Sequence, residues 1–277
     1  MRKYSWLILC LALAVLLASA FAFTRADNQT EPAFGYTLDF KKPLSGIDNL
    51  SSLSYVPEED VFVATLNRPA TILKLSKNGE ILARKSIADR IKDAESIEYA
   101  GNGTYLLVDE ADSAMYVYQL SQNLDVRSVR KIETDLFENA RNRGIEGIAW
   151  MAGRNELYFA KERKPVMLYR TQSDSGLTHF SEIVPLDDLI KNLDVDDISA
   201  LHIHGEHLLI LSDESRSLTE IDLNGNVLRR MSLTQGENGL EEDIPQPEGV
   251  SMDKAGNIYI MSEPNLFYRF EKVSTGR

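Results

Sequence analysis

The chain has 277 residues, with 30 Lys and Arg against 42 Asp and Glu, and a formal net charge of −12. This acidity disfavours nucleic acid and anionic membrane surfaces as partners. Cys10 is the single cysteine, so disulfides, thiol catalysis and cysteine-ligated metals are excluded from everything that follows it.

An apolar segment near the N-terminus predicts export. Arg2 and Lys3 precede an apolar run of 18 residues, Trp6 to Phe23, in which only Ser19 is polar. The run is longer than a usual signal-peptide core and just short of the roughly 20 residues that span a bilayer. It is either a cleaved signal or an uncleaved anchor with its N-terminus inside, and its length favours the anchor. The predicted parts are a signal or anchor (1–26), a linker (27–33) and an exported domain (34–277).

The exported region contains five copies of a short motif. The motif has six positions. In order, they hold an apolar or small residue, Glu or Ser, a small residue, an apolar residue, any residue, and an apolar or aromatic residue. Successive copies begin 44, 51, 53 and 49 positions apart, which is the spacing of propeller blades. The copies are Leu50–Tyr55, Ala94–Tyr99, Ile145–Trp150, Ile198–Ile203 and Pro247–Met252.

Each motif is followed by a turn and further strand-like runs, which predicts a four-stranded antiparallel blade. Gly and Asn in turns such as Gly101-Asn102-Gly103 supply the positive φ that tight hairpins need. The fifth unit stops after a third strand, whereas residues 35–40 alternate like a strand and precede the first motif. We therefore expect an all-β, five-bladed β-propeller whose last blade is completed by the N-terminal strand, with six blades as the alternative.

Two rings of polar side chains are predicted around one mouth of the propeller channel. Residues at the same repeat position encircle the axis, and the start of a first strand lies beside the end of the second. The first ring, at the second motif position, consists of Glu95, Glu146, Glu248, Ser51 and Ser199. The second ring follows 15 or 16 residues later and consists of Asn67, Glu110, Glu162, Glu214 and Glu263.

The first ring predicts a calcium site. Carboxylates that converge without basic partners repel one another, so they acquire raised pKa values or bind a cation. Hard oxygen ligands in a loose geometry favour Ca²⁺ over zinc or copper. The alternative is that the glutamates line a water-filled channel or cap loop amides. For the second ring, the favoured interpretation is that its charged side chains are exposed to water and bind no ion.

A histidine-rich segment and one tryptophan are better explained by packing than by binding. The histidines of the sequence His202-Ile203-His204-Gly205-Glu206-His207 are interpreted as packed or solvated, because no closed set of metal ligands accompanies them. Trp150 is interpreted as core packing between blades rather than as a ligand platform.

The repeated motif resembles the SdiA-regulated (YjiK-like) family of bacterial exported proteins, which is distantly similar to NHL-repeat propellers. The resemblance is carried by residues 94–97, 144–148 and 246–250 and covers nearly the whole exported region. It implies a five-bladed propeller with a bound calcium ion and no established activity. It also implies a Gram-negative protein, anchored on the periplasmic side of the inner membrane or, if the leader is cleaved, free in the periplasm.

Two functions of different classes follow. In the first, the protein is a non-catalytic envelope module, a monomer that binds Ca²⁺ and presents its loops to an envelope protein or a small ligand. In the second, it is a calcium-dependent hydrolase of an ester, lactone or phosphoester, with Glu110 or Glu162 as general base. The first is favoured because no convincing His or Asp base stands out, and a fold does not establish an activity.

Overall fold

The computed structural model describes residues 35–132, 144–161 and 165–273. The chain divides into a unit of Met1–Pro32 and a unit of Ala33–Arg277, and all described residues belong to the second. The predicted leader and linker lie outside the described residues, as does Glu162. Within the described part, no helix is long and apolar enough to cross a membrane.

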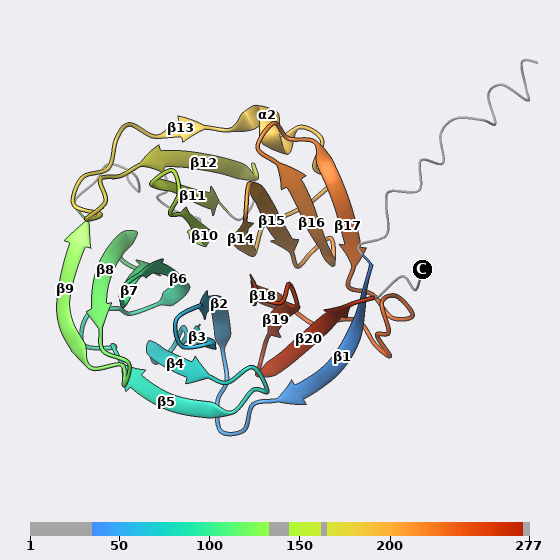
Figure 1. Cartoon of the computed structure of the whole chain (residues 1–277), viewed down its shortest axis with the longest axis horizontal. Coiled ribbons are helices and arrows are strands. Elements are labelled where there is room, and N and C mark those ends of the chain that lie inside the picture. The colour runs from blue at the N-terminus through green and yellow to red at the C-terminus, as the bar shows by residue number, and fades with distance from the viewer. Residues whose placement is uncertain (1–34, 133–143, 162–164, 274–277) are drawn as a thin grey trace, which may run out of the picture. The chain divides into compact units, whose positions relative to one another are not determined.

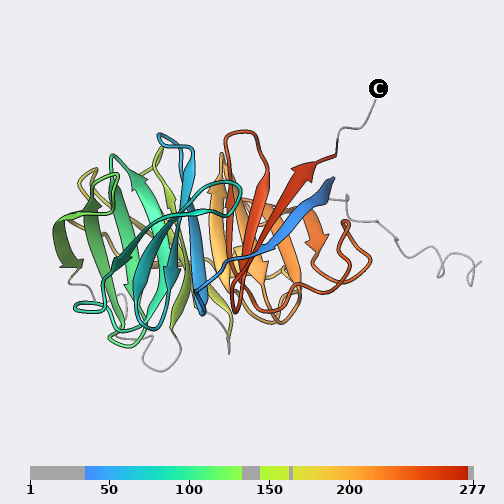
Figure 2. The same cartoon turned by 90° about the horizontal axis from the view of Figure 1, so that it is seen from below.

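Five four-stranded antiparallel sheets are arranged in a ring, which confirms the predicted five-bladed β-propeller and not the six-bladed alternative (Figure 1). In each sheet the strand that carries the motif lies next to the centre (β2, β6, β10, β14 or β18). Figure 2 shows the blades edge-on. Blade 1 is β2 (Leu50–Val56), β3 (Val61–Leu66), β4 (Thr71–Leu75) and β5 (Ile81–Ser86). Blade 2 is β6 (Ala94–Gly101), β7 (Thr104–Asp109), β8 (Ala114–Leu120) and β9 (Val126–Ile132).

The remaining blades follow the same order. Blade 3 ends in a strand of only two residues, and a short helix connects it to blade 4. Blade 3 is β10 (Ile145–Met151), β11 (Glu156–Lys161), β12 (Met167–Gln172) and β13 (Val184–Pro185), followed by α2 (Asp187–Ile190). Blade 4 is β14 (Ala200–His204), β15 (His207–Ser212), β16 (Ser217–Asp222) and β17 (Val227–Ser232). Blade 5 is β18 (Pro247–Met252), β19 (Ile258–Ser262), β20 (Leu266–Lys272) and β1 (Tyr36–Pro43).

The last blade is built from both ends of the described chain, as predicted. β1 pairs antiparallel with β20, from Tyr36 opposite Lys272 to Pro43 opposite Leu266. The Tyr36 hydroxyl donates to the Gly256 carbonyl at 2.8 Å, and Arg269 Nη2 lies 2.6 Å from Asp39 Oδ2. This pairing covers the edge of β20 and closes the ring.

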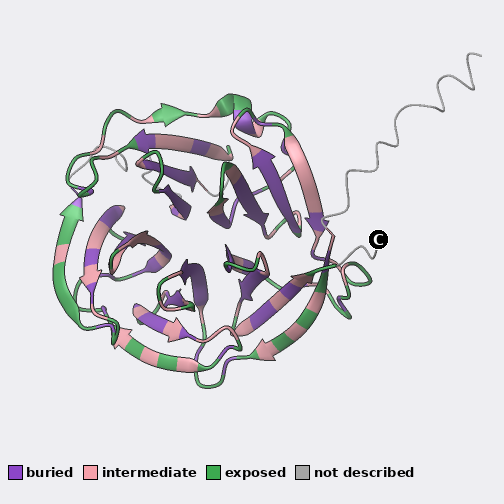
Figure 3. Ribbon diagram, in the orientation of Figure 1, coloured by how far each residue is buried: buried purple, intermediate pink, exposed green. Residues whose placement is uncertain are grey.

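The hydrophobic core lies between the blades. Five clusters of buried apolar side chains each join two neighbouring blades. Burial falls from the centre outwards: β2 is buried at every position, whereas β5 alternates between half-buried and exposed (Figure 3). Second strands such as β3 and β15 therefore read as short, nearly continuous apolar runs, whereas the inner strand β2 buries three serines and the outer strand β5 alternates.

Small residues at the third motif position let neighbouring inner strands approach each other. A Cβ added at Gly147 would lie 2.9 Å from the Leu201 amide nitrogen of blade 4. A Cβ added at Gly249 would lie 2.9 Å from the Leu53 amide nitrogen of blade 1. In blade 1 the equivalent Ser52 uses its Oγ to accept from the Ile97 amide at 2.7 Å. This position is small because the next blade's backbone leaves no room.

Side chains at the fifth motif position connect the blades around the channel. In four of the five blades this side chain accepts a hydrogen bond from the backbone amide of the sixth motif residue of the next blade. Ser251 accepts from Tyr55 (3.1 Å), Ser54 from Tyr99 (3.0 Å), Glu98 from Trp150 (3.1 Å) and His202 from Met252 (3.3 Å). Blade 3 carries Ala149 at this position, which has no polar side-chain atom to offer.

Replacing Ser54 by Ala tests the strength of this connection. Ser54 is 2% exposed, accepts from the Tyr99 amide and donates to Glu98 Oε2 at 2.8 Å. The variant removes a partner from the half-buried Tyr99 amide and from the buried Glu98 carboxyl group, so we expect a loss of about 1–3 kcal/mol in the free energy of unfolding. Urea unfolding at pH 7 measures it, and an unchanged midpoint would contradict the role of this ring.

Glu98 gives the propeller a pH-dependent stability. Burial raises its pKa from 4.5 to about 7, against the opposing effect of hydrogen bonds from the Trp150 amide and Ser54. The folded protein thus holds this proton more tightly than the unfolded chain. The stability that it contributes is present below pH 4.5 and is lost as pH rises towards 7.

The difference in unfolding free energy between wild type and Glu98→Gln should therefore fall across that interval, by at most about 1.4 kcal/mol per pH unit. His202, whose pKa burial lowers to about 3, imposes the opposite trend between pH 3 and 6.5. Its effect cancels in the difference, because both proteins retain it. Chemical unfolding of both proteins at each pH provides the measurement, and a pH-independent difference would disprove the assignment.

Candidate functional site

The second motif residue sits at a β-bulge in four of the five blades. The register between first and second strands shifts around Ser51, Glu95, Glu146 and Glu248. A bulge leaves one residue unpaired and re-aims its side chain. In blade 4 the equivalent Ser199 directly precedes β14. The motif thus turns its second side chain away from the regular alternation of the strand.

Three carboxylates converge where blade 1 meets blade 2. One oxygen of each of Asp93, Glu95 and Glu110 lies within 4.8 Å of the other two. Among the described residues, no other set of three Asp, Glu, His or Cys side chains brings its ligand atoms this close together. Asp93 precedes β6, Glu95 is the bulge residue of β6, and Glu110 follows β7. Asn67, which follows β3 of blade 1, donates from Nδ2 to Glu95 Oε1 at 3.4 Å.

Two oxygens at this cluster have no hydrogen-bond partner among the described residues. Asp93 is 1% exposed, and its Oδ1 is buried without a partner. Its other oxygen, Oδ2, forms an ion pair with the mostly exposed guanidinium of Arg68. Asn67 Oδ1 is likewise buried without a partner. A buried oxygen acceptor without a donor costs free energy, and a bound cation would remove that cost.

The cluster raises the pKa of Glu95 to about 8. Burial is the largest cause, and the Asp93 charge, a side-chain hydrogen bond between Glu95 and Asp93, and the Glu110 charge add to it in that order. The hydrogen bond from Asn67 acts in the opposite direction. Without a cation, Glu95 therefore holds its proton at neutral pH.

Backbone contacts fix the carboxylates in place. The buried Asp109 side chain accepts from the backbone amides of Lys92 and Asp93, both at 3.1 Å. Glu110 Oε1 accepts from the Gly144 amide of blade 3 at 3.1 Å. A Cβ at Gly144 would collide with the Glu110 side chain, so this close approach requires glycine.

The other first-ring residues lie apart from this cluster. Ser51 Oγ lies 3.5 Å from the Asn49 carbonyl, and Ser199 Oγ donates to the Pro247 carbonyl at 2.6 Å. Glu146 and Glu248 are half-buried on β10 and β18 and do not belong to the three-carboxylate group. The structure thus brings together Glu95 of the first ring with Asn67 and Glu110 of the second.

Glu263 follows β19 of blade 5, and the acidic residue of blade 4 whose charge acts on it is Asp213. Burial raises the pKa of Glu263, and the Asp213 charge raises it further. Glu214, the residue selected from the spacing, uses its backbone amide to donate to Asp197 Oδ1 at 3.0 Å. The fixed 15- or 16-residue offset therefore missed the equivalent position in this blade by one residue.

Sequence reasoning missed Asp93 and Arg68. The residue directly before the motif is polar in four copies, namely Asn49, Asp93, Asp197 and Gln246, and that regularity could have revealed Asp93. Arg68 gives the cluster a basic partner that the sequence had not indicated. The histidines also separate: His202 contacts the neighbouring blade, His204 is exposed, and His207 Nδ1 lies 2.6 Å from Glu220 Oε1.

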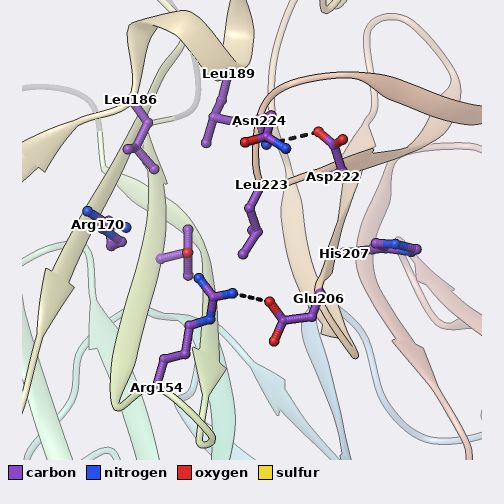
Figure 4. A pocket seen from close by; sticks show the side chains of 10 residues that line it. Arg154, Arg170, Leu186, Leu189, Glu206, His207, Asp222, Leu223 and Asn224 are labelled. Carbon is purple, nitrogen blue, oxygen red and sulfur yellow. Dashed lines mark hydrogen bonds and ion pairs between the residues drawn. The ribbon is translucent and has the colours of Figure 1, made fainter.

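A cavity of about 330 Å³ lies between blades 3 and 4, beside the β10–β11 and β14–β15 hairpins (Figure 4). Arg154 on one wall forms an ion pair with Glu206 on the other. Arg170 Nη1 lies 3.3 Å from Glu156 Oε1, and Asp222 accepts from the amide of Asn224 at 2.9 Å. Arg154 and Glu206 thus pair across the cavity, while Arg170 and Asp222 are engaged by other groups.

The sequence model of the family described as SdiA-regulated matches residues 26–271. Among solved structures, the propeller is similar to a glutaminyl cyclase from Myxococcus xanthus, with a TM-score of 0.61, 11% identity, and coverage of 85% of this chain and 95% of that chain. A gluconolactonase from Xanthomonas campestris gives a TM-score of 0.52 at 11% identity, covering 86% of this chain and 98% of that chain. A streptogramin B lyase gives a TM-score of 0.53 at 12% identity, and the match covers 85% of this chain and 97% of that chain. At these identities the likeness shows the propeller fold alone.

Proposed function

The chain belongs to the SdiA-regulated family, and we propose that it is a non-catalytic propeller module that binds Ca²⁺ between blades 1 and 2. Asp93, Glu95, Glu110 and Asn67 would supply the oxygen ligands. The observation that carries the proposal is the pair of buried, unpartnered oxygens, Asp93 Oδ1 and Asn67 Oδ1, beside two further carboxylates.

Charge supports a cation at this place. Three carboxylates face one guanidinium, that of Arg68, whose charge also acts on Glu95 and Glu110. That guanidinium is 70% exposed, so water screens much of its charge. A divalent cation would offset the remaining repulsion, which adds to burial in raising the pKa of Glu95.

The kind of ligand favours calcium. The group contains carboxylate and amide oxygens and no His or Cys. Such hard oxygen sets suit Ca²⁺, which tolerates irregular geometry and completes its shell with water, whereas zinc prefers nitrogen and sulfur. Because Asn67 comes from blade 1 and the carboxylates from blade 2, the ion would fasten the two blades together.

The proposed setting is the bacterial envelope. The charged residues Arg2 and Lys3 followed by the apolar run of residues 6–23 support export to the periplasm, with or without a retained anchor. There the acidic propeller would act as a monomer and present its loops to an envelope protein or a small ligand.

A calcium-dependent hydrolase is the second candidate, and one observation favours it. Glu95 has a pKa of about 8 in a cluster that could hold a Lewis-acidic ion, and perturbed carboxyl groups gather at catalytic sites. The gluconolactonase with a similar fold makes lactones a sensible first substrate class. The binding module remains the favoured proposal, because Glu110, the base considered from the sequence, already accepts from the Gly144 amide, and a shared fold does not establish an activity.

Calorimetric titration of Ca²⁺ into the full chain tests the site. Glu95→Gln and Glu110→Gln should each weaken binding at least about tenfold, since each removes a charged ligand worth about 1.5–3 kcal/mol. Asp197→Asn is the matched control, because this buried carboxylate is already satisfied by Ser212 and two backbone amides.

Glu146→Gln distinguishes this site from a ring around the channel. It should bind Ca²⁺ like wild type if the ion lies between blades 1 and 2. A loss equal to that of Glu95→Gln would refute the inter-blade site and favour the ring of first-motif glutamates. Heats indistinguishable from buffer for wild type would eliminate both.

Calcium should also stabilise the propeller, because it binds the folded state. At a free concentration one hundred times Kd the gain is about 2.7 kcal/mol. Thermal unfolding with Ca²⁺ or chelator measures it, with Glu95→Gln expected to show no shift. Turnover of a lactone or ester panel that needs Ca²⁺ and is lost in Glu95→Gln would instead establish the hydrolase.

A further inference from the structure

A second cavity, of about 420 Å³, opens between blades 2 and 3. Its walls come from the β6–β7 turn, β8, β9, the β10–β11 hairpin and the loop that follows β12. β6 runs for eight residues, or about 25 Å of extended chain. The cavity at its far end is therefore well separated from the carboxylate cluster at its beginning.

The lining has no carboxylate among the described residues, although the protein is strongly acidic and carries 42 Asp and Glu residues. Amide and hydroxyl side chains supply its polarity, including Asn102, Gln119, Asn155 and Ser128. The single charged side chain, Arg130, donates from Nη2 to the Leu177 carbonyl at 2.6 Å.

Internal hydrogen bonds hold these groups in position. Gln119 Nε2 donates to the Asn102 carbonyl at 2.6 Å, and its Oε1 accepts from Thr104 at 2.9 Å. The loop wall is tied to β9 by Arg130 and is braced internally by Asp174, which accepts from the Thr178 and His179 amides. The cavity is thus largely preformed, which lowers the entropy cost of binding.

Trp150 supplies an aromatic surface with a spare donor. It lines the cavity and is 8% exposed. Its indole N–H donates no hydrogen bond within the described part of the chain, although a largely buried Trp usually finds an acceptor. The small exposed part of the indole, beside amides and hydroxyls, suits a sugar, which has C–H groups and a rim of hydroxyl groups.

We propose that this cavity binds a neutral oligosaccharide. The sugar face would pack on Trp150, while hydroxyl groups would exchange hydrogen bonds with Gln119, Asn155 and the indole N–H. A volume of about 420 Å³ lies within the usual range for small-ligand sites. The absence of carboxylates and the engaged Arg130 favour an uncharged ligand over an amine or an acid.

Tryptophan fluorescence provides a direct test, since the chain has two tryptophans, Trp6 and Trp150. In the full chain carrying Trp6→Phe, emission reports on Trp150 alone. Maltotriose and tri-N-acetylchitotriose are titrated as neutral probes and trigalacturonate as a charged one. We expect a saturable change with a neutral probe, a much smaller one with trigalacturonate, and the same affinity in the presence of chelator.

Two variants and a control locate the binding. Asn155→Gly removes the amide yet suits the positive φ of 52° at this position, and Gln119→Ala removes the second amide. Each should weaken binding about fivefold, the cost of one hydrogen bond near 1 kcal/mol. Gln235→Ala, an exposed residue outside the cavity, should have no effect.

No saturable change with either neutral probe, at concentrations up to tens of millimolar, would overturn the proposal. The proposal would also be overturned if Asn155→Gly and Gln119→Ala both bound the probe as tightly as wild type and had the same melting temperature as wild type. Equal binding of trigalacturonate would show that the site does not select neutral sugars.

Discussion

The contact between neighbouring inner strands is the constraint on which the rest of the structure depends. Gly147 and Gly249 let one blade's backbone meet the next, with no room for a Cβ. Around the same circle, Ser54, Glu98, His202 and Ser251 accept amides from the following blade. Packing alone is weakly directional, so these hydrogen bonds fix the register of one blade on the next.

The same inner strands position the candidate metal ligands. A bulge at the second motif residue turns Glu95 out of the strand alternation, while the third residue, Ser96, remains buried among the strands. Asp109 holds the backbone of Lys92 and Asp93, so the carboxylates stand on a rigid support. The affinity of such a site depends on this support as well as on its ligands.

The sequence predicted the fold well because a propeller repeats one local pattern. Five motif copies, the turn residues and the unpaired N-terminal strand sufficed for the blade count and the closure by β1. The sites were harder, since the repeat implies equivalence that the blades do not keep. Glu95 was found from its motif position, but Asp93 stands outside the motif and gains its importance from its place beside Glu95 and Glu110 and from its ion pair with Arg68. Trp150 was correctly assigned to a blade interface, yet only the three-dimensional arrangement shows that it also lines a cavity.

The pairing of β1 with β20 joins residues as far apart as Tyr36 and Lys272. Such a contact cannot form until β20 has been synthesised. Blades 1 to 4 can acquire their local hairpins earlier, but each exposes an apolar flank until its neighbour arrives. Ring closure is therefore a late, high-contact-order step, and the interval before it is when the chain is most exposed to proteases and aggregation.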